Sequence, residues 1–341
     1  MNKKIFNLLQ YVLFLGLGIF LVWWSVGKIS HEQWEKMKAA ITHANFWLII
    51  PVIVTLMLSH FSRALRWKIL MKPLGYNPGT MNTYMAVLLG YFFNQFVPRM
   101  GEVAKCTVLA RYEKVPADKL VGTIVAERAF DLVCLVVVFA ITFFTQIDII
   151  GGYAQTTINN IITDKAGGFS WTNTIITLVV IAAVIGVLRF LLHRFAHIHV
   201  VQKLKQVIKN IWHGLTSIRY IKNKGWFIFH TVLIWTLYLV SIWIGMFAMK
   251  ETSIYGIKES FSVLSMGSIG MIATQGGIGA YPFLVQQTML LYGLDENVGN
   301  AFGWLLWLVQ FFMILLFGAL TLVLFPMLNN KKTANNTTSI D

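Results

Sequence analysis

Asn94-Gln95-Phe96-Val97-Pro98-Arg99-Met100-Gly101-Glu102 interrupts a hydrophobic stretch that runs over residues 83–113. A second hydrophobic stretch, 260–293, is interrupted midway by Thr274-Gln275-Gly276-Gly277-Ile278-Gly279-Ala280-Tyr281-Pro282. Because proline removes a backbone donor and glycine loosens a helix, each stretch is predicted to bend back on itself. Irregular backbone at membrane depth persists only where protein or a wet cavity surrounds it. A pair of such segments in corresponding halves of a chain is typical of a transporter's binding site.

The composition indicates an integral membrane protein. Hydrophobic residues make up 57% of the 341 and charged residues only 12%, as expected for a chain with membrane-spanning helices. In a soluble chain the net charge of +14 would suggest nucleic acid as a partner. In a membrane protein the distribution of charge along the loops matters instead, so no nucleic acid is expected. Cys106 and Cys134 show no metal-ligand or redox spacing, and neither a metal nor another cofactor is expected.

Six full membrane spans are predicted from the apolar runs, each long enough to cross a hydrocarbon core of about 30 Å. The first run is interpreted as an uncleaved span, because Trp23 and Trp24 stand where a signal-peptide cleavage site needs small residues. The six spans cover residues 8–26, 46–66, 120–145, 174–193, 226–248 and 299–327.

Lysine and arginine assign the loops between these spans to two sides. The N-terminus, residues 62–82 and residues 189–224 carry basic residues and no acidic residue, which indicates a cytoplasmic location under the positive-inside rule. Residues 146–173 and 249–259 hold few or balanced charges and are expected outside. The last span returns the C-terminus to the cytoplasm. We therefore expect a multi-pass protein of the cell inner membrane with both termini cytoplasmic.

The charge pattern is consistent only if each interrupted stretch enters and leaves on the same side, as a re-entrant helical hairpin. The first hairpin then starts and ends in the cytoplasm, and the second starts and ends outside. Each half of the chain, 1–145 and 174–328, has the order span, span, hairpin, span, and the halves enter in opposite orientations. The prediction is an all-α polytopic membrane protein with an inverted-topology repeat in a single membrane domain, 1–328, counted as about eight transmembrane segments.

Two polar segments are expected on the cytoplasmic side of the membrane. Residues 195–223 alternate basic and apolar positions at helical spacing. This pattern favours either an amphipathic helix on the anionic inner leaflet or a solvated basic loop. Residues 329–341 are polar and are predicted to form a disordered tail.

Charged and polar residues surround the first break. Arg99, Glu102 and Lys105 follow Asn94 closely, and Glu102 and Lys105 share a face of the returning helix because they are three residues apart. Charges at membrane depth are expensive and mark functional sites. The alternative is a shallow hairpin whose charges lie in cytoplasmic water. We favour the functional interpretation, with Arg99 and Lys105 as contacts to a phosphate group.

A second charged cluster, Glu127, Arg128 and Asp131, lies inside an otherwise apolar span. Glu127 and Asp131 are four residues apart and share a face, and Arg128 is placed to pair with Asp131. The cluster is either an ion network that locks the hairpin to the span, through Arg99 or Lys105, or a set that carries protons or orients a ligand.

Arg63 and Arg66 lie one turn apart near the end of the span 46–66, next to Trp67. Snorkelling anchors beside an interfacial tryptophan would explain them. Phosphate binding is the alternative, because guanidinium groups hold phosphate oxygens bidentately.

The second break is neutral and contains Gln275, Gly277, Gly279 and Tyr281. Its glycines allow close approach by another backbone or by a ligand. The helix that begins near Tyr281 would direct its positive dipole end at the cavity and favour an anion there. These four residues are therefore candidate contacts to the substrate.

Motifs for common catalytic chemistry do not occur. The sequence has no Walker-type phosphate loop, no His-Glu-x-x-His run and no Gly-x-Ser-x-Gly elbow. The loops are also too short to hold a soluble catalytic domain of ordinary size. Catalysis and ATP-driven pumping by this chain alone are therefore not expected.

The sequence resembles the membrane region of lysylphosphatidylglycerol synthases, a flippase-like family that also occurs as stand-alone membrane proteins. Four motifs carry the resemblance: Arg63-x-x-Arg66-Trp67, Asn94-x-x-x-Pro98-Arg99-x-Gly101-Glu102, Glu127-Arg128-x-x-Asp131 and Gly276-Gly277-Ile278-Gly279. The resemblance implies a region that moves aminoacylated phosphatidylglycerol between leaflets, while a separate soluble domain makes that lipid. Lysyl-transferase activity is not expected of these 341 residues. Gln275 and Pro282 depart from the family pattern, so a different lipid is expected.

The leading hypothesis is a lipid transporter that binds an anionic phospholipid or polyprenyl-phosphate headgroup between the two hairpins and moves it between leaflets. Membrane lipids are then its partners. One alternative is an enzyme or membrane subunit of lipid or cell-envelope glycan synthesis that uses Glu102 or Asp131 as a base. Another is a scaffold that recruits a soluble synthase through residues 195–223. The sequence sets no oligomeric state.

Overall fold

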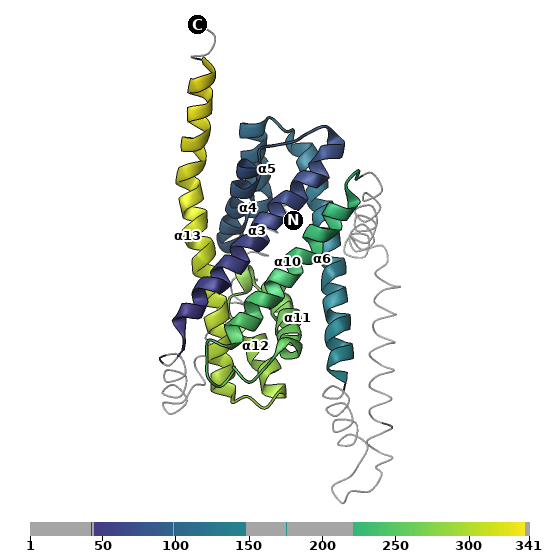
Figure 1. Ribbon diagram of the computed structural model, residues 1–341, viewed down its shortest axis with the longest axis vertical. Coiled ribbons are helices and arrows are strands. Elements are labelled where there is room, and N and C mark those ends of the chain that lie inside the picture. The colour runs from purple at the N-terminus through teal and green to yellow at the C-terminus, as the bar shows by residue number, and fades with distance from the viewer. Residues whose placement is uncertain (1–41, 43, 98, 148–174, 176–220, 338–341) are drawn as a thin grey trace, which may run out of the picture.

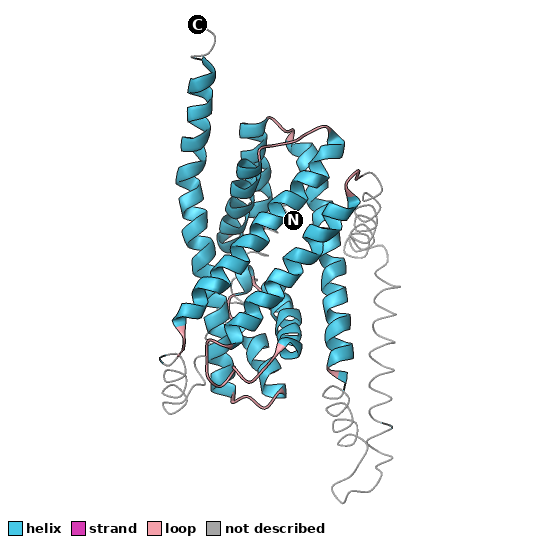
Figure 2. Cartoon of the chain, in the orientation of Figure 1, coloured by secondary structure: helices cyan, strands magenta, loops and turns pink. Residues whose placement is uncertain are grey.

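The computed structural model describes residues 42, 44–97, 99–147, 175 and 221–337, and every regular element in that part of the chain is a helix (Figures 1 and 2). The predicted spans 8–26 and 174–193, apart from residue 175, lie outside the described residues, as does most of the basic segment 195–223. The all-α membrane class that the sequence predicts agrees with this helical architecture.

Three of the described helical segments are long and apolar enough to cross a membrane: Phe46–Leu74, Lys224–Met246 and Glu296–Asn329. They coincide with the predicted spans 46–66, 226–248 and 299–327. The predicted span 120–145 forms helix α6 (Ala117–Thr145), which is 29 residues long.

Helices α3 (Ile49–Met71) and α10 (Lys224–Met246) lie along one another at the centre of the molecule (Figure 1). A short helix, η1 (Phe46–Leu48), precedes α3, and Asn45 caps it through a hydrogen bond from Trp47 N of 3.3 Å. Another short helix, η2 (Lys72–Leu74), follows α3, and the chain leaves it at Gly75 with φ 86°. The two long helices join through Ser62 Oγ and His230 Nδ1, 2.9 Å apart.

The first interrupted stretch forms a helical hairpin of α4 (Thr80–Phe96) and α5 (Met100–Glu113). The chain turns at Arg99, which has φ 63°. The two helices touch at glycine, since a Cβ on Gly101 would overlap the carbonyl oxygen of Gly90. Only a residue without a side chain allows this approach.

The second interrupted stretch forms a hairpin of α11 (Ile257–Ala273) and α12 (Ala280–Leu291), joined by the short helix η4 (Gln275–Gly277). A glycine again lies at the contact, because a Cβ on Gly270 would approach Tyr281 Cα to 2.7 Å. In Figure 1 this hairpin lies below the first one, and η4 contacts α4 where the two turns meet.

Helix α6 follows the first hairpin, and the long helix α13 (Glu296–Thr337) follows the second. Helix α6 packs on α11, where Thr142 Oγ1 lies 2.8 Å from Ser265 Oγ, and α13 packs on α12 and α4. Residues 329–337, the first part of the predicted disordered tail, continue α13. No glycine or proline ends the helix there, and Asn329 Nδ2 donates to Asn82 Oδ1 of α4 at 3.1 Å.

Two groups of four helices follow one another in the same order along the described chain: α3, α4, α5, α6 and then α10, α11, α12, α13. The later helices start 175, 177, 180 and 179 residues after the earlier ones (49 to 224, 80 to 257, 100 to 280, 117 to 296). Helices α3 and α10 both have 23 residues, and α4 and α11 both have 17.

The buried side chains form two large apolar clusters, one drawn mainly from each group of helices. The first cluster surrounds Trp67 and Leu109, and the second surrounds Met246 and Phe302, all four fully buried. A small third cluster joins α3 to α13. Burial on this scale supplies most of the stability of a packed interior, so the hairpins are held by their own half of the structure as well as by each other.

Candidate functional site

Two arginines of α3 meet two carboxylates of α6 in the interior. Arg63 Nη1 lies 2.9 Å from Glu127 Oε1 and 2.6 Å from Asp131 Oδ2. Arg66 Nη2 lies 2.6 Å from Asp131 Oδ1 and 3.4 Å from Glu127 Oε1. The side chains of Arg66 and Glu127 are 0% and 2% exposed. Spacings of three and four residues put each pair on one face of its helix, so each arginine reaches both carboxylates.

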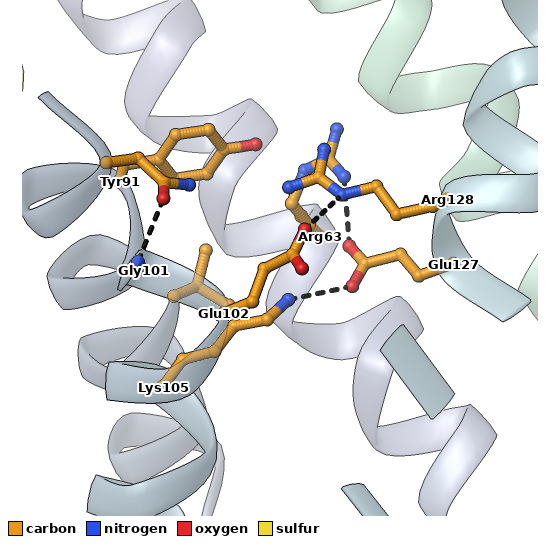
Figure 3. Close-up of a pocket in the computed structure, with 10 residues that line it drawn as sticks. Arg63, Tyr91, Gly101, Glu102, Lys105, Glu127 and Arg128 are labelled. Atoms are coloured by element: carbon orange, nitrogen blue, oxygen red, sulfur yellow. Dashed lines mark hydrogen bonds and ion pairs between the residues drawn. The ribbon is translucent and has the colours of Figure 1, made fainter. Parts of the chain in front are cut away.

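The first hairpin adds two further ion pairs to this group (Figure 3). Lys105 Nζ of α5 lies 3.1 Å from Glu127 Oε2, and Arg128 Nε of α6 lies 3.1 Å from Glu102 Oε1. The Arg128 and Glu102 side chains are 50% and 35% exposed, in contrast to the buried pairs. We call the seven residues the ion network: Arg63, Arg66, Glu102, Lys105, Glu127, Arg128 and Asp131.

The ion network carries one more formal positive charge than negative charge. Three buried cations, Arg63, Arg66 and Lys105, surround the two carboxylates of α6. The exposed pair of Arg128 and Glu102 adds one charge of each sign. A buried charge without a partner is costly, so an anion next to the network would be favoured.

A cavity of about 410 Å³ lies beside the ion network, between α3, α6, α10, α11 and α13. At its polar end Arg63 Nη2 donates to Tyr238 Oη at 3.3 Å. The remainder is mainly apolar and is lined by Leu56, Leu132, Leu135, Ile242, Val263, Leu264, Met271, Ile272 and Leu306. We call it the central cavity. Its size is in the range of small-molecule sites, and its two ends differ in polarity.

A narrow pocket of about 10 Å³ lies next to the same polar residues and is drawn in Figure 3. Its volume is about that of one water molecule. Arg63, Tyr91 and Arg128 line both this narrow pocket and the central cavity, so the two spaces share part of their walls. The narrow pocket is otherwise lined by Val87, Gly90, Asn94, Gly101, Glu102, Lys105 and Glu127.

The turns of the two hairpins touch through hydrogen bonds. Gln275 Nε2 donates to the backbone oxygen of Asn94, whose own Oδ1 accepts from Gly101 N at 2.8 Å. Trp307 Nε1 of α13 donates to Gly276 O at 2.9 Å. Asn94 and Gln275, which the sequence places 181 residues apart, are thus brought together.

The glycines of the second turn give it the backbone conformation in which it contacts the first turn. Gly276, Gly277 and Gly279 have φ of 60°, 75° and 72°, a backbone region that glycine enters without strain. Tyr281 is buried, packs on α11 and lines the central cavity. Of the four predicted contacts in this break, Tyr281 is the one that borders that cavity.

Arg99 lies apart from the ion network. It is exposed at the start of α5, and among the described residues it forms no ion pair. Lys105, the other predicted phosphate contact of this hairpin, does reach the network. The spacing in the sequence had suggested that Arg128 pairs with Asp131. In the structure Arg128 pairs with Glu102 instead.

The sequence interpretation missed the polar residues that α10 and α4 contribute. Thr231 Oγ1 accepts from Arg66 Nη1 at 3.5 Å, and Tyr238 accepts from Arg63. Tyr91 of α4 lines both pockets. Thr231, Trp235 and Tyr238 follow one another by four and three residues, so this polar stripe on an apolar helix was the signal that could have found them.

These features define a helical membrane protein with a buried ion network and a cavity that is charged at one end and apolar at the other. Within the described ranges, no three His, Cys, Asp or Glu residues gather as metal ligands.

The chain belongs to the family described as the lysylphosphatidylglycerol synthase TM region, whose sequence profile matches residues 8–318. The resemblance inferred from the four motifs is thereby confirmed. The chain is also 24% identical over 313 residues to the UPF0104 membrane protein MJ1595 of Methanocaldococcus jannaschii. The aligned region covers 87% of this chain and 90% of the relative. No solved structure matches the sequence.

Proposed function

We propose that this protein binds a lipid with an anionic phosphate-containing headgroup in the central cavity and moves it between the leaflets of the cell inner membrane. The observation that carries the proposal is the polarity of that cavity, which has guanidinium groups at one end and an apolar body. A headgroup phosphate fits the first environment and an acyl or prenyl chain fits the second. The extra positive charge of the ion network would be offset by the phosphate.

Exposed apolar residues of the cavity wall support a lipid over a soluble anion. Leu132 of α6 and Ile272 of α11 line the central cavity and are among the exposed large hydrophobic residues. We infer from their exposure that the cavity opens at the surface between these two helices. A lipid chain could remain in the bilayer there while its headgroup occupies the polar end, whereas a soluble anion needs no such opening.

Arg128 is the proposed phosphate contact. It lines the central cavity, its side chain is half-exposed, and its partner Glu102 is itself partly exposed. Its guanidinium group could exchange Glu102 for a phosphate, which it would hold bidentately. Arg63 borders the same space, but buried carboxylates hold its guanidinium group. We therefore propose that Arg63 positions its neighbours and adds positive electrostatic potential at the site, without binding the phosphate itself.

We propose that the two groups of helices, each with one hairpin, form an inverted repeat that supports transport. The matched order, lengths and offsets of the two helix groups support it, as does the contact between the hairpin turns. Binding sites of such transporters lie where the repeats meet. We propose cytoplasmic termini and re-entrant hairpins on the basis of the loop charges, with the narrow pocket and the central cavity facing opposite sides of the membrane.

The enzyme alternative receives less support from the geometry. Glu102 and Asp131, its candidate bases, both accept hydrogen bonds from arginine side chains, at 3.1 Å and 2.6 Å. A carboxylate occupied in this way is poorly placed to take a proton from a substrate. Transport therefore explains the arrangement better.

A reconstitution experiment tests the proposed function. Purified protein in phosphatidylglycerol vesicles should move a fluorescent short-chain phosphatidylglycerol between leaflets, as measured by its loss of fluorescence to an impermeant reductant. Arg128→Gln should slow this movement by about tenfold or more, the effect of one charge-assisted hydrogen bond. Arg128→Lys should retain part of the rate.

Arg111→Gln is the matched control, because Arg111 is an exposed arginine of α5 outside both pockets. It should transport at the wild-type rate. The proposal fails if wild-type vesicles behave as protein-free vesicles do, or if Arg128→Gln and Arg111→Gln transport equally fast.

A further inference from the structure

A second concave site lies at the opposite end of the α3–α10 pair from the second hairpin and shares no lining residue with the central cavity. Its volume is about 390 Å³. The polar and aromatic residues that line it are Lys68, Lys72, Asn77, Asn223, Trp226 and His230. We call it the Lys68–Lys72 pocket. Neither the family nor the proposed transport assigns a role to it.

The chemistry of this lining fits a phosphate group. Two ammonium groups face the pocket and no carboxylate lines it. Lys68 Nζ donates to Thr80 Oγ1 at 2.7 Å, which holds its position and leaves two of its three protons for a ligand. Asn223, which precedes α10, also lines the pocket, and its side-chain amide is a hydrogen-bond donor. Cations and amide donors together bind phosphate oxygens.

A buried side chain of α10, bonded to α3, forms the base of the pocket. His230 is only 8% exposed, and its Nδ1 is fixed against Ser62 Oγ at 2.9 Å. The same contact joins α3 to α10, so the pocket has a rigid base formed by both helices. Leu65 and Ile69 complete the wall on the α3 side.

The surroundings of the pocket indicate the depth at which it opens. Trp226 is 61% exposed at its rim, and the neighbouring Ile228 and Phe229 are exposed as well. Exposed tryptophan beside lysine is typical of the layer where lipid headgroups meet water. Lysines in this layer attract anionic lipids.

We propose that the Lys68–Lys72 pocket binds the phosphate group of an anionic lipid from the adjoining leaflet. The site is separate from the central cavity, so this proposal stands whether or not the protein transports lipid. The shared chemistry also admits free phosphate, and the experiment distinguishes the two sources.

Native mass spectrometry of the full chain, titrated with phosphatidylglycerol, tests the assignment. Lys68→Gln/Lys72→Gln should bind one lipid fewer, or bind it about tenfold or more weakly, because two cations next to phosphate are lost. Lys250→Gln/Lys258→Gln is the matched control: these exposed lysines line neither pocket, and the loss of charge is the same. The control should bind phosphatidylglycerol as the wild type does.

Two further variants separate this site from the transport site and from a folding defect. Arg128→Gln, altered in the central cavity, should keep the lipid bound at the Lys68–Lys72 pocket. Lys68→Arg/Lys72→Arg keeps both charges and should also retain that lipid. The proposal is overturned if the Lys68/Lys72 and Lys250/Lys258 glutamine variants bind phosphatidylglycerol equally.

Inorganic phosphate is the second probe. If the lipid is the ligand, excess inorganic phosphate should neither raise the unfolding temperature of the wild type nor displace the bound phosphatidylglycerol. A rise that is seen in the wild type, is absent from Lys68→Gln/Lys72→Gln and is not matched by phosphatidylglycerol would assign the pocket to free phosphate and reject the lipid.

Discussion

Lys105 is the third cation around the two buried carboxylates of α6, and its effect on stability differs from that of the arginines. Its ammonium group lies 3.1 Å from Glu127 and 4.6 Å from the centre of the Trp67 ring. The arginines alone would balance the carboxylates. Lys105 is therefore the residue whose charge is left over, and its removal should affect ligand binding more than folding.

Replacing Lys105 with methionine tests this distinction. Lys105→Met keeps the aliphatic stem and leaves two arginines with two carboxylates, so unfolding in detergent should change by no more than about 1 kcal/mol. Glu127→Gln instead leaves three cations with one carboxylate and should cost about 3–5 kcal/mol. Unfolding titrations of both variants measure the difference. Equal destabilisation would contradict the charge count.

Pairing of the α6 carboxylates with Lys105 was one of the alternatives that the sequence offered, whereas their pairing with Arg63 and Arg66 was not predicted. Spacing showed that Glu127 and Asp131 share a face, but it could not show which helix lies opposite. Arg63 and Arg66 were open to interpretation as surface anchors, because Trp67 follows them. In the structure Trp67 is itself buried, and its Nε1 donates to Thr123 Oγ1 at 2.8 Å. Only the packing of α3 against α6 turns these arginines into a paired set.

Both hairpins close through a glycine of the first helix and the residue eleven positions later. In the first hairpin these are Gly90 and Gly101, and in the second they are Gly270 and Tyr281. Because the same contact occurs in both hairpins, the distance between the two helices of each hairpin depends on the size of the residues at this contact. Helix pairs in membranes often approach through small residues for the same reason.

Gly101→Ala should therefore weaken the first hairpin. The added methyl group would overlap the carbonyl oxygen of Gly90, and the forced separation should cost about 1–3 kcal/mol or more. Gly122→Ala in α6 is the control, because a Cβ there meets nothing within 4 Å, and alanine in a helix should gain about 0.5–1 kcal/mol. The midpoints of thermal unfolding compare the two, and a Gly101→Ala midpoint as high as that of Gly122→Ala would contradict the contact.

The breaks in the two apolar stretches were enough to predict the helical elements around them. Pro98 and the glycines of 276–279 stand where α4 ends and before α12 begins. The direct hydrogen bond between the turns was beyond prediction, because it joins residues far apart in sequence.

At the scale of the whole molecule, the loop after α5 and the loop after α10 should face opposite sides of the membrane. Single cysteines replacing Lys114, which follows α5, and Ile254, which follows α10, test this in a background without Cys106 and Cys134. An impermeant maleimide added to intact cells should label only the cysteine at position 254, by the distribution of loop charges. Permeabilised cells should label both positions, and labelling of position 114 in intact cells would reject the orientation.

The wall of Arg63, Tyr91 and Arg128 that the two pockets share would have an electrical consequence. If water entered the two pockets from opposite sides of the membrane, the membrane potential would fall mainly across this shared wall. One headgroup charge that crosses it would gain or lose about 2.3 kcal/mol per 100 mV. In a cell with a negative interior this field would push an anionic headgroup outward. The direction of net lipid movement would then be set by the voltage of the membrane, without any chemical fuel bound to the chain.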